Sequence, residues 1–442
     1  MHPGSMTTDN PAASGHTIET LVTPRITLIV LLLTTALLYM GTGLFGTLLG
    51  VRASLEDFAP AWIGLIMSSY FVGFIIGAYV CVHIIQQVGH IRAFAAFAAV
   101  FTAMALAHAI WVEVWPWVVF RLISGIAVVG LALVIESWLN AQAPADARGR
   151  VFSVYMVVNL SAVAAGQLLL MAGDPATFVL FSVAAVLFVL SLVPTTVVRV
   201  SAPAPQPAGG LGLKALLKAS PVGVIGCLVS GIVGGAFWGM APVFITDLGY
   251  DRNQVAVFMF VAIVGGMISQ FPVGRFSDSR DRRKVIAGVT ILASVAAALV
   301  SVTAAISFNA LIGAAFLFGA LVFPIYGLTV ARTHDMLRPD QVLEATRGLL
   351  QFFAIGAAIG PFAAGVLMGV LGGYALFGGM AAALAAMGAY CIYRLRKGKA
   401  LAPEEQCHFV PIYATSQEAL AMAEDEYYPE EEDGAPGKDE RN

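Results

Sequence analysis

Long runs of apolar residues constrain this chain more than any other feature of its sequence. Each run holds roughly 18 or more residues with almost no charge, and at about 1.5 Å per residue such a helix crosses a hydrocarbon core of roughly 30 Å. The 442 residues are 59% hydrophobic and only 12% charged, whereas a typical soluble domain carries about 25% charged residues. The bilayer is therefore the solvent of this chain.

The runs predict an all-α integral membrane protein of twelve transmembrane helices, in two pseudo-symmetric halves of six. The spans are expected at 26–50, 61–86, 93–112, 117–141, 151–172 and 176–198, and then at 219–246, 254–276, 285–305, 308–331, 346–370 and 374–393.

The segments outside the two bundles are polar. Residues 1–24 contain no apolar core of the kind that a signal peptide needs, and are expected to form a cytoplasmic segment before the first bundle, 25–198. Residues 199–218, rich in Pro, Ala and Gly, predict a cytoplasmic linker to the second bundle, 219–393. The acidic tail, 394–442, repels itself and is expected to be disordered.

The basic residues predict the orientation. Nearly all Lys and Arg residues fall in segments that an even number of spans places on one side, while only Arg52 and Arg252 lie on the other. Because positive loops stay on the cytoplasmic side during insertion, we expect both termini in the cytoplasm.

A charged segment before the ninth span carries a recognisable pattern. GRFSDSRDRRK resembles the signature loop of the major facilitator superfamily, with Gly274, Asp278, Arg282 and Arg283 at the family's Gly, Asp and basic pair. Asp281 replaces the second Gly of the pattern, and the copy before the third span is degenerate. The resemblance implies a secondary transporter with the twelve-helix major facilitator fold, and it implies that this loop acts as a gate.

We expect the gate to work through ion pairs at the cytoplasmic ends of the helices. Asp278 is predicted to pair with Arg347 or Arg332 when the protein faces outward, and Arg148 and Arg150 occupy the matching loop of the first half. The alternative is that these arginines only fix the topology.

The fourth span holds two ionisable residues. Arg121 and Gly125 match the superfamily's Arg-x-x-x-Gly motif, and Glu136 lies fifteen residues after Arg121, on nearly the same face of a helix but about 22 Å further along it. Charges inside a span are costly and mark functional sites. Glu136 is either a proton carrier, with Arg121 biasing it or holding an anionic substrate, or a fixed latch bonded to Arg148 or Arg150.

The segment VIESWLN at 134–140, together with the Arg121 motif, resembles the poorly characterised YcaD-like bacterial branch of the superfamily. This resemblance implies the inner membrane of a bacterium and brings no settled substrate. His83 and His108 are further candidates for a proton relay, and the alternative is that each is a hydrogen-bonded interface residue.

In this superfamily the first, fourth, seventh and tenth helices line the central path. The candidates for the cavity wall, including residues of neighbouring helices, are Tyr39, Thr42, Tyr70, Ser124, Asn159, Phe237, Trp238, Phe323, Tyr326 and Gln351. Aromatic residues dominate this set, which favours an amphipathic or aromatic solute. The eleventh span contains GAAIGPFAAG, which resembles the Gly-rich antiporter motif that exporters carry in the fifth span.

The sequence therefore predicts a proton-coupled transporter of a small organic solute that works by alternating access, as a monomer in the lipid bilayer. The alternatives are a lipid or glycolipid flippase on the same fold, and a non-transporting receptor or scaffold. No nucleotide-binding loop, metal constellation or nucleophile–base pair is visible, so we expect no enzyme activity, no cofactor, no metal and no nucleic-acid partner.

Overall fold

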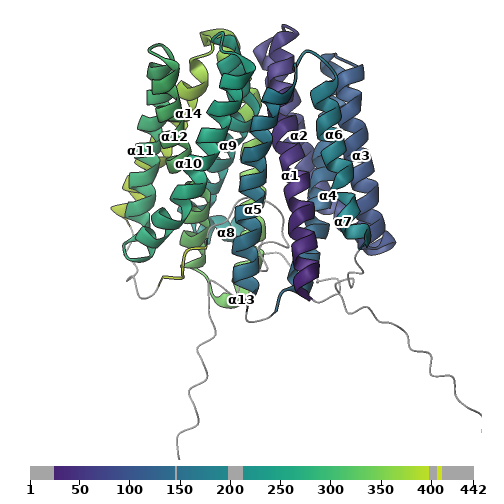
Figure 1. Ribbon diagram of the computed structural model, residues 1–442. Coiled ribbons are helices and arrows are strands. Elements are labelled where there is room, and N and C mark those ends of the chain that lie inside the picture. The colour runs from purple at the N-terminus through teal and green to yellow at the C-terminus, as the bar shows by residue number, and fades with distance from the viewer. Residues whose placement is uncertain (1–23, 145–146, 198–212, 398–405, 411–442) are drawn as a thin grey trace, which may run out of the picture.

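The computed structural model describes residues 24–144, 147–197, 213–397 and 406–410. Within these ranges the secondary structure is helical throughout (Figure 1). The elements are α1 (Pro24–Leu55), α2 (Pro60–Val88), α3 (His90–Ile110), α4 (Val114–Gln142), α5 (Arg148–Leu168), η2 (Leu169–Ala172), α6 (Val179–Leu190), α7 (Leu192–Val197), α8 (Leu213–Ala219), α9 (Pro221–Asp247), α10 (Arg252–Asp278), α11 (Arg282–Ala304), α12 (Phe308–His334), α13 (Pro339–Leu371) and α14 (Ala375–Leu395).

Twelve helical stretches in the described residues are long and apolar enough to cross a membrane, which confirms the predicted count. The sixth of them, Val179–Thr196, combines α6 and most of α7. Its predicted start at 176 is wrong by three residues, because the turn after η2 extends to Phe178. The predicted seventh span begins too early as well, since Pro221 starts α9 and the short α8 precedes it.

The helices run nearly parallel in two groups, α1–α7 and α8–α14, which stand side by side in Figure 1. We call the face where α1 begins and α14 ends the terminal face, and the face where α1 ends and α2 begins the opposite face. Large apolar side chains such as Ile29, Phe271 and Val295 remain exposed on the described helices. Such an apolar exterior suits contact with lipid.

Glycines let α2 and α4 meet backbone to backbone inside the first half. A Cβ on Gly73 would lie 2.0 Å from the carbonyl oxygen of Leu122, and a Cβ on Gly125 would lie 2.0 Å from that of Tyr70. Close approach through small residues is the usual way in which helices pack in lipid, where no hydrophobic force drives them together. Gly125 of the Arg-x-x-x-Gly motif therefore fixes where α4 sits against α2.

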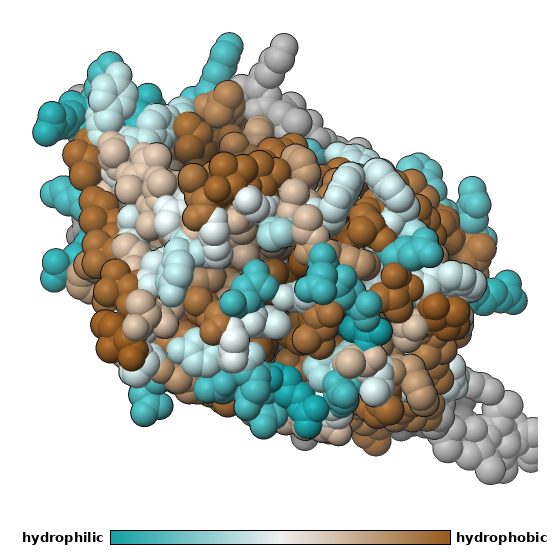
Figure 2. Space-filling view, turned by 90° about the horizontal axis from the view of Figure 1, so that it is seen from above, coloured by the Kyte–Doolittle hydropathy of each residue, from teal (hydrophilic) through white to brown (hydrophobic). Residues whose placement is uncertain are grey.

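The two halves touch closely near the opposite face, through α2 and α13. A Cβ on Gly64 would lie 2.4 Å from the carbonyl oxygen of Pro361, and a Cβ on Gly365 would lie 2.3 Å from that of Pro60. The Ser68 hydroxyl also accepts a hydrogen bond from the backbone N–H of Phe362, at 3.0 Å. Seen from this face, the atoms form a continuous surface in which hydrophilic and apolar residues are mixed (Figure 2).

The GAAIGPFAAG segment of α13 thus makes contacts in two directions. Gly356 and Gly360 would each place a Cβ 2.1 Å from a carbonyl oxygen of α9, inside the second half. Pro361 and Gly365 instead meet α2 of the first half. The glycine pattern that resembles an antiporter motif is a packing surface between three helices.

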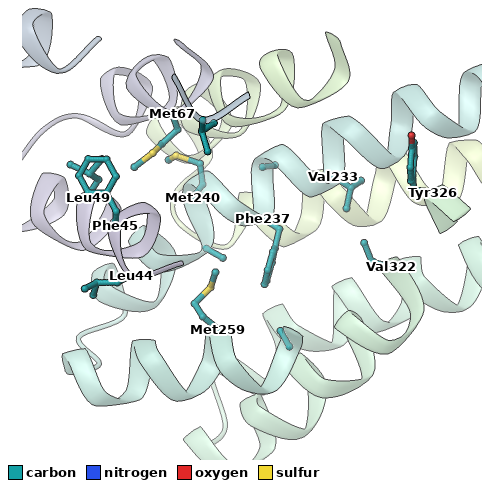
Figure 3. Packing of buried hydrophobic residues seen from close by; sticks show 14 of the residues in the cluster. Leu44, Phe45, Leu49, Met67, Val233, Phe237, Met240, Met259, Val322 and Tyr326 are labelled. Carbon is teal, nitrogen blue, oxygen red and sulfur yellow. The ribbon is translucent and has the colours of Figure 1, made fainter. Parts of the chain in front are cut away.

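The buried core continues across the two halves, below these backbone contacts. Met67 of α2 and Met240 of α9 lie next to each other, with Phe45 and Leu49 of α1 nearby (Figure 3). Phe237 points from α9 into the interior of the second half and is 1% exposed. Flexible methionine side chains fill gaps between such surfaces without a strict shape requirement.

Three predicted segments lie largely outside the described residues: the N-terminal segment 1–24, the linker 199–218 and the tail 394–442. Of the linker, 213–218 belong to α8, and of the tail, Arg394, Leu395 and Gln406–Val410 are among the described parts. Within the predicted tail, Gln406–Val410 are described, and there Cys407 is 7% exposed and Val410 is fully buried. These five residues pack against the terminal face of the second half.

Candidate functional site

A central cavity lies between the two halves. Its wall comes from α1, α2, α4 and α5 of the first half and from α9 and α13 of the second. Its empty volume is about 1160 Å³, open space at its mouth included. Aromatic and small side chains make most of the wall, so the cavity can hold an organic solute together with some water.

Arg121 is the only charged residue among the described residues that line this cavity. It is 6% exposed, and no hydrogen bond or ion pair to it is found in the described part of the chain. Its guanidinium lies over the Tyr70 ring, 4.2 Å from the centroid, and 5.8 Å from the centroid of Phe45. Such cation–π contacts engage none of the guanidinium N–H donors in a hydrogen bond.

The Arg-x-x-x-Gly motif explains how this cation is held. Because Gly125 lets α4 approach the backbone of Tyr70, the Tyr70 ring comes to lie over Arg121 one turn earlier on α4. The motif therefore builds a cation–π pair at the cavity wall.

Glu136 is fully buried and does not line the cavity. Its Oε1 accepts a hydrogen bond from the Tyr155 hydroxyl at 2.6 Å. Tyr155 in turn lies beside Tyr39, and Tyr39 does line the cavity. Two phenol groups thus connect the buried carboxylate with the cavity wall.

The other predicted cavity residues fall into two groups. Thr42, Tyr70, Asn159 and Trp238 line the cavity, as Tyr39 does. The Asn159 amide is buried and lies beside the Tyr39 hydroxyl. The Thr42 hydroxyl bonds to the Leu38 carbonyl of its own helix.

The second group lies behind the wall or beside it. Phe323 packs on Phe237 and Trp238 with ring centroids 5.9 Å apart, and the Tyr326 ring packs on Phe353 at 5.0 Å. Gln351 is not among the residues that line the cavity. Its Nε2 donates to the Tyr79 hydroxyl of the other half at 2.6 Å. Ser124 is fully buried, without a partner for its hydroxyl.

Neither predicted relay histidine lines the cavity. His83 is exposed, and its Nδ1 lies 2.9 Å from the Tyr79 carbonyl oxygen. His108 is fully buried, with Nδ1 2.6 Å from the Met104 carbonyl oxygen and its ring packed on Trp117 and Phe120. In both histidines Nδ1 thus bonds to a carbonyl of the same helix.

The signature loop forms a charge cluster at the terminal face. Arg282, whose side chain is fully buried, donates to Asp278 at 2.6 Å and also to Asp335 at the end of α12. Asp335 further lies 3.7 Å from Arg332. In this structure Asp278 therefore pairs with Arg282, one turn further along the chain. The predicted partners Arg332 and Arg347 make other contacts.

The tail segment completes this cluster. Arg282 donates to the Cys407 carbonyl at 2.7 Å, and the backbone N–H of Phe409 donates to Asp278 at 3.0 Å. The Phe409 ring covers Gly274, where a Cβ would lie 2.0 Å from the ring. Burial raises the pKa of Asp335 despite the nearby guanidinium of Arg282, and it raises the pKa of the Cys407 thiol to about 12.

The remaining predicted gate residues have local roles or lie apart from the cluster. Arg283 makes an ion pair with Asp281 at 3.0 Å, and Asp281 accepts a hydrogen bond from the Arg283 backbone N–H at the start of α11. Arg148 is the first residue of α5, and Arg150 is exposed.

Sequence reasoning missed the residues that complete the site. Tyr155, which holds Glu136, comes from another helix, and nothing in its local sequence distinguishes it from a packing tyrosine. Phe353 of α13 also lines the cavity. Among the described residues no group of His, Cys, Asp and Glu is arranged to hold a metal ion.

The twelve spans, the two packed halves and the central cavity between them define a membrane transporter of one large class. The chain belongs to the major facilitator superfamily, because the sequence profile described as Major Facilitator Superfamily matches residues 31–342 and 224–414. This match confirms the resemblance that the signature loop indicated.

Among its relatives are proteins described as the uncharacterized MFS-type transporter YcaD. The one from Escherichia fergusonii is 26% identical over 319 residues, which cover 71% of this chain and 81% of the relative. The one from Salmonella newport is 27% identical over 312 residues, which cover 70% and 80%. The similarity to the YcaD-like branch is thus confirmed.

Two solved structures have a similar fold. The nucleoside transporter NupG has a TM-score of 0.68 and 14% identity, with 84% of this chain and all of that chain covered. A bacterial homolog to the human lysosomal transporter Spinster, in an inward-facing and unoccupied conformation, has a TM-score of 0.64 and 14% identity, with 92% and 99% covered. At this identity the likeness establishes the fold alone.

Proposed function

We propose that this chain is a proton-coupled secondary transporter that moves a small organic solute across the bacterial cytoplasmic membrane by alternating access. It acts as a monomer, and both of its termini lie in the cytoplasm. The observation that carries the proposal is the pair of tyrosines that connects the buried Glu136 with the central cavity. Solute sites of such transporters lie near the bilayer midplane, between the two structural repeats.

The contacts support Glu136 as the proton-carrying group. An ionisable residue buried at membrane depth is costly, and such residues commonly mark proton relays. A phenol hydroxyl both donates and accepts hydrogen bonds, so Tyr39 can take a proton from the cavity while it passes its own to Tyr155. Tyr155 then passes its own proton to Glu136, and both phenols end as they began.

The arrangement of the two halves supports alternating access. Near the opposite face they meet through glycines and a proline, and elsewhere through methionine and aromatic side chains. Such a contact can separate as a rigid-body movement without changing the packing inside either half. The Asp278–Arg282–Asp335 cluster and residues 406–410 stabilise the terminal end of the second half during that movement.

The test is proton flux in proteoliposomes that contain the full chain and are challenged with a panel of organic solutes. We expect solute-driven proton movement in the wild type, its loss in Glu136→Gln, and slower movement in Tyr39→Phe. Glu113→Gln is the matched control, because Glu113 precedes the same helix and is exposed. Solute flux without proton movement in the wild type would contradict coupling.

The same experiment separates the alternatives. A flippase would move labelled lipid between leaflets and would lose little in Glu136→Gln. A receptor or scaffold would move neither solute nor protons, and its function would depend on residues 401–442.

A further inference from the structure

The cavity contains a buried cation that nothing in the described protein neutralises. Arg121 is buried, with only 6% of its surface exposed, and its Nε has no hydrogen-bond partner among the described residues. The ion pairs of the described residues lie elsewhere, at Arg52, Arg282, Arg283 and Arg332. A charge taken out of water without a partner is strongly unfavourable. An anion that binds inside the cavity would therefore be stabilised by this guanidinium.

The geometry of Arg121 also indicates which anion fits. The guanidinium carbon of Arg121 lies over the Tyr70 ring, and this cation–π contact engages none of the N–H donors of the planar fork in a hydrogen bond. That fork matches the two oxygens of a carboxylate or a similar oxyanion. Because Arg121 is the one charged residue on the described wall, a second negative charge on the ligand would remain unpaired, and a positive charge would be repelled.

The rest of the wall indicates the body of the ligand. Phe71, Phe74, Trp238 and Phe353 contribute aromatic surface to the same cavity as Arg121. Rings of this kind bind planar apolar groups by stacked or edge-to-face contacts. The cavity therefore offers one cationic end and a large aromatic surface.

A second polar group is available to the ligand. Asn159 is 1% exposed and lines the cavity, where its amide lies beside the Tyr39 hydroxyl. The other amide on the wall, Gln167, is already engaged with the Thr47 hydroxyl and the Gly43 carbonyl. A side-chain amide carries an acceptor oxygen and two N–H donors, so a ligand with a polar atom on its body can bind the part of this amide that Tyr39 does not engage.

We propose that the transported solute is a monovalent organic oxyanion with an aromatic body, bound through its anionic group to Arg121. This inference rests on the proposed function in one respect, that the central cavity is the solute site. It goes further by assigning the charge, the headgroup chemistry and the residue that recognises it. Cations and dianions are excluded by the same charge balance.

The test is equilibrium binding to the purified full chain in nanodiscs, without any proton gradient. The probes are shape-matched triads with charges of −1, 0 and +1: benzoate, benzamide and benzylamine, and indole-3-acetate, indole-3-acetamide and tryptamine. We expect the anion of at least one triad to bind about 10- to 100-fold more tightly than its neutral analogue, since a hydrogen bond to a charged group is worth that factor. Benzenesulfonate then shows whether the headgroup must be a carboxylate, and tighter binding of either oxyanion supports the proposal.

Variants locate the preference. Arg121→Gln is expected to abolish the difference between anion and amide, and Arg121→Lys to retain part of it, because Lys keeps the charge but loses the planar fork. Arg92→Gln is the matched control, since Arg92 is an exposed arginine near the start of α3 that does not line the cavity.

Three results would overturn the inference: anion and amide binding alike, the amine binding best, or no anion of the panel binding at all. A preference that survives in Arg121→Gln would also refute it. Failure of proton coupling alone would leave anion binding intact and describe an anion uniporter, so the two proposals fail separately.

Discussion

Replacing Gly64 by Ala tests whether the close contact between α2 and α13 holds the two halves together near the opposite face. A Cβ at this position would lie 2.4 Å from the carbonyl oxygen of Pro361, whereas ordinary contacts begin at 3.4 Å. The backbones must therefore separate by about 1 Å, or the overlap must be accommodated in place. Overpacking of this kind costs roughly 1–3 kcal/mol.

The cost falls only on the conformation in which these two helix ends touch. The equilibrium between conformations should therefore shift by about 5- to 150-fold toward the one in which they are apart. A separated state populated at about 1% would rise to roughly 5% to 60%.

The measurement is the distance between spin labels on Ala59 and Leu371, which are exposed next to the contact, in a background without the four native cysteines. We expect a new, longer-distance population in Gly64→Ala. Gly73→Ala is the matched control, because its Cβ would meet Leu122 inside the first half and should destabilise that half without separating the two. An unchanged distance distribution in folded Gly64→Ala, or the same change in Gly73→Ala, would refute the reasoning.

Three further predictions concern the terminal face. Phe409→Ala should release the tail segment and raise the rate at which maleimide labels Cys407, which is now buried with a raised pKa; mass spectrometry locates the label, and an unchanged rate would contradict the packing. Asp281→Ala should lower the stability of the protein by about 1 kcal/mol near neutral pH through loss of a helix cap. Hydrogen bonds and charge interactions with Arg283 outweigh burial and lower the pKa of Asp281 in the folded protein. The wild type should therefore lose its extra stability over Asp281→Ala as the pH falls through the pKa of this carboxyl in the folded state. Melting curves of both proteins at several pH values check this, and a stability difference that does not change with pH would contradict it. Arg282→Gln should cost about 3–5 kcal/mol in thermal melts, because it removes the guanidinium that pairs with the buried Asp335, and a near-wild-type melt would mean that the cluster does not stabilise the fold.

Much of the fold follows from the sequence because lipid imposes simple rules. Backbone groups inside a bilayer must be satisfied within the segment, so a long apolar run has to be a helix. The signature loop at Gly274 and the match of both profile segments to the superfamily fix the arrangement of those helices. The helix ends were less predictable, since Pro221 and the turn before Val179 moved them by two or three residues.

The candidate site depended on contacts between helices, which a sequence read one helix at a time does not contain. Helical periodicity placed Arg121 and Glu136 on similar faces of α4, yet only Arg121 reaches the cavity. Glu136 is reached through Tyr155 of another helix, and its place in the site depends on how α4 packs on α5.

By itself the sequence determined the membrane class, the number of spans, the superfamily and the presence of one arginine and one glutamate in the fourth helix. The tertiary structure decided which polar groups share a cavity, which cation is left without a counter-ion, and where the tail segment binds. The physical reason is that insertion into lipid depends on the composition of each segment. Side-chain pairing instead depends on the distances between helices, which are set by the close approach of residues such as Gly125 and Gly64 to their neighbours.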